Sequence, residues 1–338
     1  EGNDITVVSG ARSKIDVDTS GGGTSDIAIT AGDDSSINVD AGFSFDTSVQ
    51  IHSGDGGTAK VDADGANIDI DIYGSSRDKV STYGAYASVY TYGGDDEIDV
   101  YSLGADVDSG DGDDTVTVGA VGASVRLGAG NDTAWVGAVG VHLDAGSGDD
   151  IINLTATGAN VLGGSGNDTI HVLAAGANIV AGSGNDVVYA ANFGARIDTG
   201  DGNDTIHAAA AGSYIDSGAG NDTLYLVGLA SGVSTGAGDD QVYSAAAGQF
   251  IHAGGGDNVV IGLGGANVVV AEEGDDLVMA AGGANVLATG AGDDDILAVG
   301  HANVAITDAG DDSVFMIGGI LSTPAALLSP NLNGLGAM

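Results

Sequence analysis

Several residue types are scarce or missing in this sequence. It has no cysteine, two prolines, 5% aromatic residues and seven basic residues against 48 acidic ones. Without cysteine there is no disulfide framework and no thiolate metal site, so any metal must be bound by oxygen or by the six scattered histidines. A formal net charge of −41 argues against nucleic acid or an anionic membrane as a partner, because both would repel the chain. No apolar run reaches the about 18 residues that a membrane span needs.

Enzyme signatures are missing as well. The sequence has no nucleophile elbow, no phosphate-binding loop that leads into a helix, and no HExxH motif. After residue 80 the only basic residues are Arg126 and Arg196, which leaves little to bind a polyanionic substrate. We therefore predict that the protein is not an enzyme.

Glycine and regularly spaced hydrophobic residues are abundant instead, with 61 glycines and 43% hydrophobic residues. Residues 1 to about 80 alternate apolar and polar side chains, as in NIDIDI at residues 67–72, between glycine-rich segments. This period of two residues is typical of β-strands. Motif fragments occur in this region out of register with the later repeat, so we interpret residues 1–80 as irregular coils of one solenoid.

From Gly93 onward the chain follows an 18-residue repeat. A fixed period near this length is typical of a solenoid, in which each coil buries its apolar residues by stacking on its neighbours. One apolar column follows the repeat two residues after each acidic position, as at Ile170, and a second column lies nine residues out of phase, as at Ile179. Thirteen positions in register carry an aspartate or, once, an asparagine: Asp96, Asp114, Asp132, Asp150, Asp168, Asp186, Asp204, Asp222, Asp240, Asn258, Asp276, Asp294 and Asp312.

Two inward columns per repeat predict an all-β fold, a parallel β-roll or β-solenoid with two short strands per 18-residue coil. We expect three segments. Irregular N-terminal coils span residues 1–80, the regular roll spans residues 81–316, and an uncharged cap or docking tail spans residues 317–338. The tail contains both prolines, Pro324 and Pro330, and proline cannot donate to a strand ladder.

The acidic turn at residues 163–168, GGSGND, has the chemistry of a metal site. Glycine at its second and fourth positions permits positive φ angles that turn successive carbonyls toward one point. Asp168 at the sixth position adds a carboxylate. Oxygen ligands in a flexible turn suit Ca²⁺, which takes about six to eight of them. Stacked carboxylates about 5 Å apart would repel each other without a cation.

Residues 163–171, GGSGNDTIH, resemble the RTX calcium-binding nonapeptide, GGxGxDxUx with U a large apolar residue. The resemblance covers roughly residues 91–316 and implies a parallel β-roll that is secreted and folds outside the cell. It also implies that second- and fourth-position carbonyls and the sixth-position aspartate bind calcium, completed by the next turn on the same side. We expect roughly one ion per gap between stacked acidic turns. The residues expected to bind calcium are Asp96, Gly110, Gly112, Asp114, Gly128, Gly130, Asp132, Gly146, Gly148, Asp150, Gly164, Gly166, Asp168, Gly182, Gly184, Asp186, Gly200, Gly202, Asp204, Gly218, Gly220, Asp222, Gly236, Gly238, Asp240, Asp276, Asp294 and Asp312.

The sequence departs from the nonapeptide pattern in three respects. The opposite turn of each coil has no acid, as at residues 158–160, so calcium should line one edge only and stacked asparagines such as Asn160 and Asn178 could hold the other. The late turns match the nonapeptide less well, and we expect lower calcium occupancy near Asn258, Asp276 and Asp312. The first glycine is often replaced, at Ser109, Ala145, Ala181, Thr199 and Thr235.

An outward column carries large side chains. It is interpreted either as a sheet surface that tolerates aromatic residues or as a binding strip for a neighbouring roll or a glycan. Its members are Trp135, His171, Tyr189, His207, Tyr225 and Tyr243.

We predict a secreted structural protein of the bacterial cell surface that builds a surface layer or fibre. Its expected partners are calcium, further copies of itself in head-to-tail or lateral contact, and a cell-surface glycan. The first alternative is a repeat and export module of a larger RTX adhesin, toxin or hydrolase. The second is an ice-binding roll, which requires a regular outward row that the third turn position lacks, since it reads Asp111, Ala129, Ser147, Ser165, Ser183 and Asp201.

Overall fold

A computed structural model describes residues 4–19, 26–41, 48–63, 67–155, 157–173, 175–191, 193–229 and 232–318. The chain divides into two compact units, residues 1–177 and residues 178–338. Within the described residues every regular element is a β-strand. No helix that could cross a membrane occurs in this described part of the chain. Residues 319–338, which make up most of the predicted uncharged tail, lie outside the described residues. The docking of this tail therefore stays a prediction.

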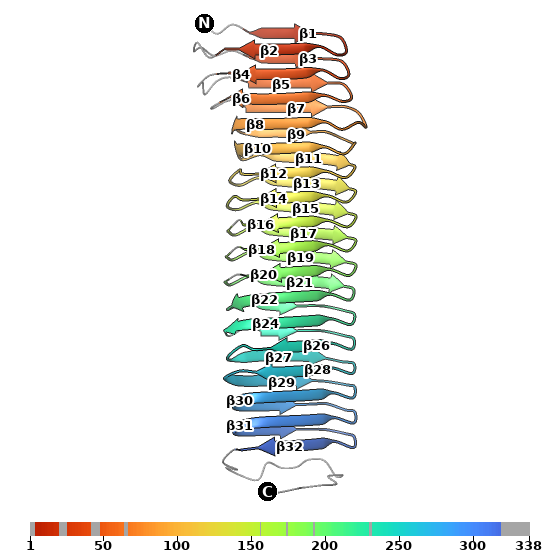
Figure 1. Ribbon diagram of the computed structural model, residues 1–338, viewed down its shortest axis with the longest axis vertical. Coiled ribbons are helices and arrows are strands. Elements are labelled where there is room, and N and C mark those ends of the chain that lie inside the picture. The colour runs from red at the N-terminus through yellow and green to blue at the C-terminus, as the bar shows by residue number, and fades with distance from the viewer. Residues whose placement is uncertain are drawn as a thin grey trace. The chain divides into compact units, whose positions relative to one another are not determined.

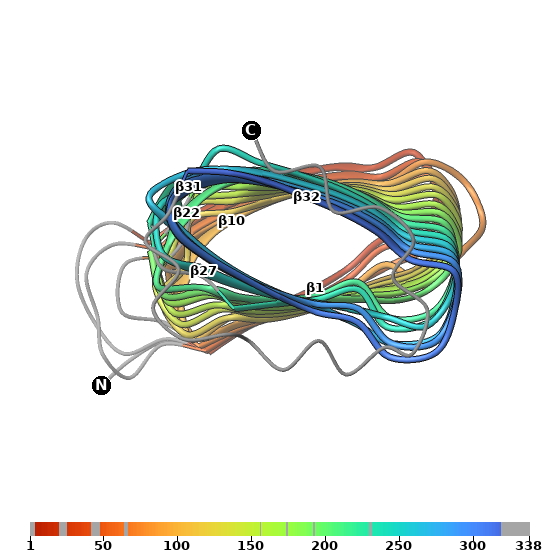
Figure 2. The ribbon, with the colours of Figure 1, turned by 90° about the horizontal axis from the view of Figure 1, so that it is seen from below.

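The first unit is a parallel β-solenoid in which each strand pairs with the strand two further along the chain, β1 with β3 and β2 with β4 (Figure 1). Odd and even strands thus form the two sides of each coil, joined by a turn at both ends, which Figure 2 shows along the stack. The strands are β1 (Ile5–Val8), β2 (Lys14–Asp18), β3 (Ile27–Thr30), β4 (Ser36–Asp40), β5 (Ser48–Ser53), β6 (Thr58–Ala63), β7 (Asn67–Ile72), β8 (Lys79–Ala85), β9 (Ala87–Tyr90), β10 (Glu97–Leu103), β11 (Asp106–Asp111), β12 (Thr115–Val118), β13 (Ser124–Ala129), β14 (Thr133–Val136), β15 (His142–Ser147), β16 (Ile151–Leu154), β17 (Asn160–Ser165) and β18 (Thr169–Val172).

The second unit has the same parallel arrangement, with β19 paired to β21 and β20 to β22. Two of its late strands run for 12 residues each, through both sides of a coil. The strands are β19 (Asn178–Ser183), β20 (Val187–Ala190), β21 (Arg196–Asp201), β22 (Thr205–Ala211), β23 (Tyr214–Asp216), β24 (Thr223–Leu229), β25 (Gly232–Ser234), β26 (Gln241–Ser244), β27 (Gln249–Gly254), β28 (Val259–Leu263), β29 (Ala266–Ala271), β30 (Leu277–Ala288), β31 (Asp295–Ile306) and β32 (Ser313–Ile317).

The register of the strands gives the length of each coil. In the first coils Ile5 pairs with Ile27, and the N–H of Ser13 donates to the hydroxyl of Ser35, both at a 22-residue step. Lys79 instead pairs with Glu97 at an 18-residue step, which the later coils repeat. The first coils are therefore longer members of the same parallel stack, which is why the sequence shows no fixed frame there. The segment boundaries at residues 80 and 316 remain predictions.

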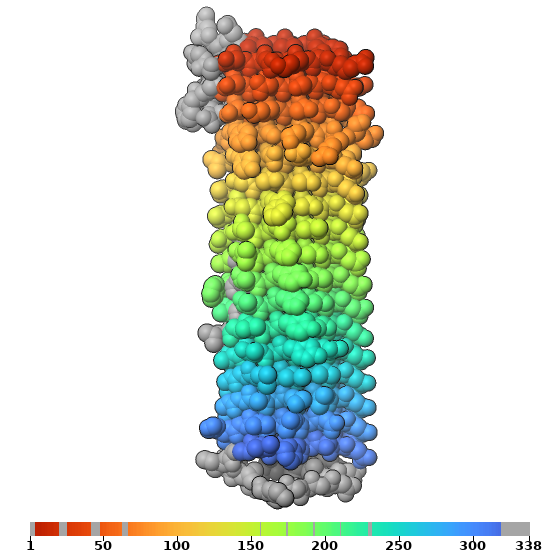
Figure 3. Space-filling view, in the orientation of Figure 1, coloured from red at the N-terminus to blue at the C-terminus, as the bar shows by residue number. Residues whose placement is uncertain are grey.

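Both predicted inward columns form the core. In the first unit Ile152 and Ile170 line one side, and Leu143 and Val161 the other, and all four are fully buried. Burying an aliphatic side chain of this size contributes roughly 1.5–3 kcal/mol, and each coil obtains that burial only from the coils stacked on it. Figure 3 accordingly shows successive coils of each unit in direct contact. The prediction of an all-β parallel solenoid with two strands per 18-residue coil is confirmed.

Candidate calcium-binding edge

The acidic turns form one edge of each unit, and their glycines occupy the predicted second and fourth positions. In the turn at residues 145–150, Gly146 has φ 101° and Gly148 has φ 124°. A Cβ atom on Gly146 would lie 2.0 Å from the carbonyl oxygen of Gly128, and one on Gly148 would lie 1.9 Å from that of Gly130. Two separate constraints thus restrict these positions to glycine. Other residues rarely adopt this backbone conformation, and a Cβ atom would collide with the carbonyl of the preceding coil.

The sixth-position aspartates form a buried ladder along this edge, which we call the inner ladder. We call each of these sixth-position residues a station. The backbone N–H of a station donates to Oδ1 of the station in the next coil, at 2.8 Å from Asp96 to Asp114 and from Asp114 to Asp132. The same bond joins Asp204 to Asp222 at 2.8 Å in the second unit. These side chains are almost completely buried, and Oδ1 already accepts one hydrogen bond within the stack.

The second carboxylate oxygen is treated differently. It is buried and accepts no hydrogen bond in the structure at Asp78, Asp96, Asp114, Asp132, Asp150, Asp204, Asp222, Asp240, Asp276, Asp294 and Asp312. An isolated buried carboxylate oxygen is costly, and it calls for a cation or a proton. Burial raises the pKa of Asp132, Asp150 and Asp222 to about 7, because the charged form loses more hydration than the N–H bond to Oδ1 replaces.

Side chains alone do not complete a metal site at this edge. The described residues contain no group of three or more histidine, cysteine, aspartate or glutamate side chains that could hold a metal ion. A metal ion at this edge would take most of its ligands from main-chain carbonyl oxygens, which suits calcium, because calcium accepts about six to eight oxygens from carboxylates, carbonyls and water. The donor set of orphaned carboxylate oxygens and glycine carbonyls fits calcium.

The inner ladder begins one coil earlier than the sequence suggested. Asp78 is fully buried, lies one 18-residue step before Asp96 and donates its N–H to Oδ1 of Asp96 at 2.8 Å. Its own Oδ1 accepts the N–H of Gly57 at 2.6 Å. The spacing could have revealed Asp78, but its turn reads YGSSRD and has serine where the nonapeptide has its fourth-position glycine.

A second polar ladder was missed from the sequence. The fifth-position residue of each turn donates its N–H to the side-chain oxygen of its counterpart in the preceding coil, from Asp113 to Asp95 at 3.1 Å and from Asn131 to Asp113 at 2.8 Å. This outer ladder is exposed, and its bonds run in the opposite direction to those of the inner ladder. Its signal is present in the sequence, because an aspartate or asparagine precedes every one of the 13 stations.

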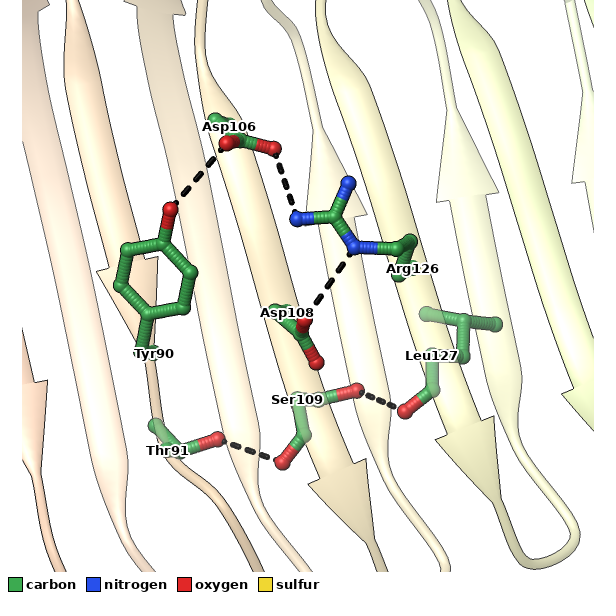
Figure 4. A network of polar contacts seen from close by, with 7 residues as sticks. All are labelled: Tyr90, Thr91, Asp106, Asp108, Ser109, Arg126 and Leu127. Atoms are coloured by element: carbon green, nitrogen blue, oxygen red, sulfur yellow. Dashed lines mark hydrogen bonds and ion pairs between the residues drawn. The ribbon is translucent and has the colours of Figure 1, made fainter.

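The replaced first glycines turn out to be structural. Thr91 and Ser109 are buried. The Thr91 hydroxyl donates to the carbonyl oxygen of Ser109 at 3.0 Å, and the Ser109 hydroxyl donates to the carbonyl oxygen of Leu127 at 2.9 Å, one coil further on in each case (Figure 4). Thr199 and Thr235 make the same bond in the second unit. Where the first residue is Ala145 or Ala181, its methyl group is buried instead.

The outer face beside this edge has its own ion pairs in the first unit. Arg126 donates to Asp106 at 3.2 Å and to Asp108 at 3.1 Å, and the Tyr90 hydroxyl also donates to Asp106, at 3.1 Å (Figure 4). The two ion pairs of Arg126 are exposed, so they contribute little stability, of the order of 0–1 kcal/mol.

The late acidic turns differ in their backbone. Glu272, Gly290 and Asp308 occupy the second position without a positive φ angle, whereas Gly274 and Gly292 at the fourth position keep φ at 129° and 149°. The register of β27 with β29 shifts between His252 and Gly254. The expected lower occupancy near Asn258, Asp276 and Asp312 remains a prediction.

The opposite edge, which we call the plain edge, turns at glycines without acids. Asn160 is exposed in the first unit, and its neighbour Ala159 is buried in its place. Amide stacking occurs instead in the last coils of the second unit. There Asn267 donates to Asn285, and Asn285 to Asn303, each at 2.8 Å.

The aromatic column is present as stacked rings in the second unit. Ring centroids lie 5.0 Å apart between Tyr189 and His207, 4.8 Å between His207 and Tyr225, and 5.3 Å between Tyr225 and Tyr243. In the first unit Trp135 is 53% exposed and lines a cavity of about 340 Å³.

Comparison with known proteins agrees with the turn chemistry. A model of the RTX calcium-binding nonapeptide repeat matches residues 160–175, 174–192, 196–226, 248–278 and 270–300. No curated protein matches the chain. A crystal structure of a hyperactive, Ca²⁺-dependent, β-helical antifreeze protein from an Antarctic bacterium is 20% identical, with 86% of this chain and 85% of that chain covered and a TM-score of 0.40. A likeness at that TM-score carries no argument about function.

Proposed function

We propose that this chain, a parallel β-solenoid with RTX calcium-binding repeats, is a secreted, non-catalytic structural protein of the bacterial cell surface. Calcium ions along the acidic edge stabilise its coils, and the coils associate into a surface layer or fibre. The row of buried carboxylate oxygens without a partner carries the calcium part of the proposal. RTX repeats are typical of secreted proteins, which supports an extracellular location.

The proposed ligands are the carbonyls of the second- and fourth-position glycines and the sixth-position aspartates, with Asp78 added to the set predicted from the sequence. A divalent ion beside each orphaned oxygen would replace its missing hydrogen bond and cancel charge that the stack otherwise concentrates. Extracellular calcium modules bind with dissociation constants of about 10⁻⁴ to 10⁻³ M, so folding would await export. Roughly one ion per gap between acidic turns is expected.

The plain edge supports lateral self-association. In the first unit Leu103, Val121 and Val139 stand at successive turns of this edge, and they are 57%, 51% and 56% exposed. The turns at residues 120–123 and 138–141 carry no charge on a chain whose net charge is −41. Two acidic edges repel each other, whereas two apolar plain edges gain burial when they meet. Head-to-tail contact through residues 317–338 is proposed as the second route.

A cell-surface glycan remains the proposed third partner. The cavity beside Trp135 is open because Gly119 and Gly137 carry no side chain there, and Thr117 and Asn153 offer polar groups next to the indole. None of its lining residues is aspartate, glutamate, lysine or arginine. An uncharged sugar stacked on Trp135 suits these neighbours.

Electron microscopy and light scattering of the purified chain, with calcium at millimolar levels and with chelator, test the assembly. We expect polymers in calcium and none in chelator. Val121→Asp with Val139→Asp should abolish lateral contacts, while Ser36→Asp with Asn38→Asp adds the same charge to an exposed sheet face, away from the plain edge and the Trp135 cavity, as the matched control. Deleting residues 319–338 should shorten polymers. Monomers in calcium would contradict the structural role and favour the repeat and export module of a larger RTX adhesin, toxin or hydrolase, and thermal hysteresis would favour ice binding.

A further inference from the structure

Asn258 is the one station of the inner ladder, among the 13 in register, that carries an amide in place of a carboxylate. The register shifts between His252 and Gly254, but the backbone at the station itself keeps the frame of its neighbours. The N–H of Val259 donates to the carbonyl of Asp240, and the N–H of Leu277 to that of Asn258, both at 2.8 Å. Asn258 is fully buried, as the aspartate stations are. The station therefore differs from an aspartate station in one side-chain atom, Nδ2 in place of Oδ2.

The side-chain oxygen of Asn258 has the role that Oδ1 has at the aspartates. It accepts the N–H of Asp240 at 3.0 Å, and the N–H of Asn258 donates to Oδ1 of Asp276 at 2.9 Å. The inner ladder thus passes through Asn258 without a break, so the asparagine is compatible with the stack.

The amide nitrogen of Asn258 is directed at the carbonyls of its own turn. Nδ2 donates to the carbonyl oxygen of Gly256 at 2.9 Å and approaches that of Gly254 at 3.5 Å. These are the fourth- and second-position carbonyls, the pair proposed to bind calcium elsewhere. Gly254 and Gly256 have φ angles of 69° and 115°, so the turn keeps its left-handed conformation.

The same place at an aspartate station is filled by an oxygen. At Asp222 and Asp240 the corresponding Oδ2 is buried and accepts no hydrogen bond. A carboxylate oxygen cannot donate to the carbonyls that an amide satisfies at Asn258. The second-position carbonyls of the Asp222 and Asn258 turns also accept a main-chain N–H, from Ala237 to Gly218 at 3.1 Å and from Glu272 to Gly254 at 2.8 Å. The aspartate turn thus differs in its unpartnered Oδ2, which calls for a positive charge where the asparagine turn has an amide.

We propose that Asn258 is a built-in metal-free station, whose side-chain amide replaces a calcium ion beside the second- and fourth-position carbonyls. The inference rests on the calcium ladder of the proposed function and specifies which station stands outside it. Within the second unit, Asn258 then separates one run of calcium stations, Asp186 to Asp240, from another, Asp276 to Asp312. The coil around it keeps its turn when calcium is removed, because its polar atoms are already satisfied.

Two opposite substitutions in the full chain test this station. Asn258→Asp creates an aspartate turn in the same glycine frame, and Asp222→Asn, the matched reverse, converts a station of equal burial that has aspartate neighbours on both sides. Bound calcium per chain is measured by elemental analysis after equilibrium dialysis, and thermal unfolding is followed in calcium-free buffer. We expect Asn258→Asp to bind one more ion than the wild type and to melt lower without calcium. Asp222→Asn should bind one fewer ion and melt higher without calcium.

The outcomes separate this inference from the proposed function. If the wild type binds several ions but the ion count of both variants is unchanged, the role of Asn258 is overturned and the calcium ladder stands. If the wild type binds no calcium at all, the ladder itself fails. An Asn258→Asp chain that folds only with calcium, and then carries the additional ion, supports the proposal.

Discussion

At the scale of single residues, the two edges set different demands on glycine. Gly146 on the acidic edge and Gly158 on the plain edge both have positive φ, at 101° and 66°. Only Gly146 faces backbone at 2.0 Å, whereas nothing lies within 4 Å of a Cβ on Gly158. Gly158→Ala should therefore lower the free energy of unfolding by about 1–2 kcal/mol, the cost of a left-handed alanine.

Gly146→Ala should cost at least twice as much, because the coils must also move apart. Denaturant unfolding of both variants at saturating calcium measures the difference, and equal losses would contradict a steric role for the acidic turn. Gly158→Asn, which tolerates the left-handed region, should lie between the wild type and Gly158→Ala and serves as the conservative control.

At the scale of the element, the inner ladder should make the metal-free fold sensitive to pH. The pKa of Asp132 and Asp150 is raised by burial to about 7 from an ordinary value of 3.8. Between these values the folded chain holds protons that the unfolded chain has lost, so the metal-free fold gains stability as pH falls from about 7 toward about 4. Below that range both states are protonated and these groups add no further gain.

Thermal unfolding in calcium-free buffer should therefore give a higher Tm at about pH 5 than at about pH 8. With calcium bound the trend should reverse, because protons compete with the ion for the same oxygens. The double variant Asp132→Asn, Asp150→Asn removes two titrating groups and should flatten the pH dependence without calcium. A Tm that rises with pH in calcium-free buffer would show that these carboxylates are not buried and unpaired in the metal-free fold.

The same element shows how far the sequence alone could lead. The 18-residue period determined both inward columns and the glycine positions, because stacking places every repeat in the same environment. The period also reaches Asp78, whose turn departs from the motif, but it could not place the first coils, where the chain takes a 22-residue step. Nor could it show the register shift between His252 and Gly254.

The sequence also could not predict in which direction the hydrogen bonds to the aspartate side chains run. Asp113 and Asp114 are adjacent and identical, yet the first accepts from the coil that follows and the second from the coil that precedes. That difference arises from burial and from the turn, which places one side chain outside and the other inside. Local composition is the same for both.

At the scale of the whole molecule, charge should couple folding to calcium. Forty-eight acids stand against seven bases, and within each unit the stack places carboxylates in successive coils next to one another. We expect the chain to lose its β-type circular dichroism in chelator and to regain it with millimolar calcium, because the ions remove both the repulsion and the orphaned buried charges.

Two controls separate those causes. Sodium chloride at about 1 M screens exposed charges within roughly 3 Å, so it should relieve repulsion on the surface but restore little structure, since the buried oxygens stay unpartnered. Magnesium supplies the same charge but requires near-octahedral geometry and retains its water, so it should restore less structure than calcium. Recovery with sodium chloride equal to that with calcium would mean that screening alone folds the chain. Unchanged circular dichroism on chelation would mean that the inner ladder is stable without any ion, with its carboxylates protonated or hydrated.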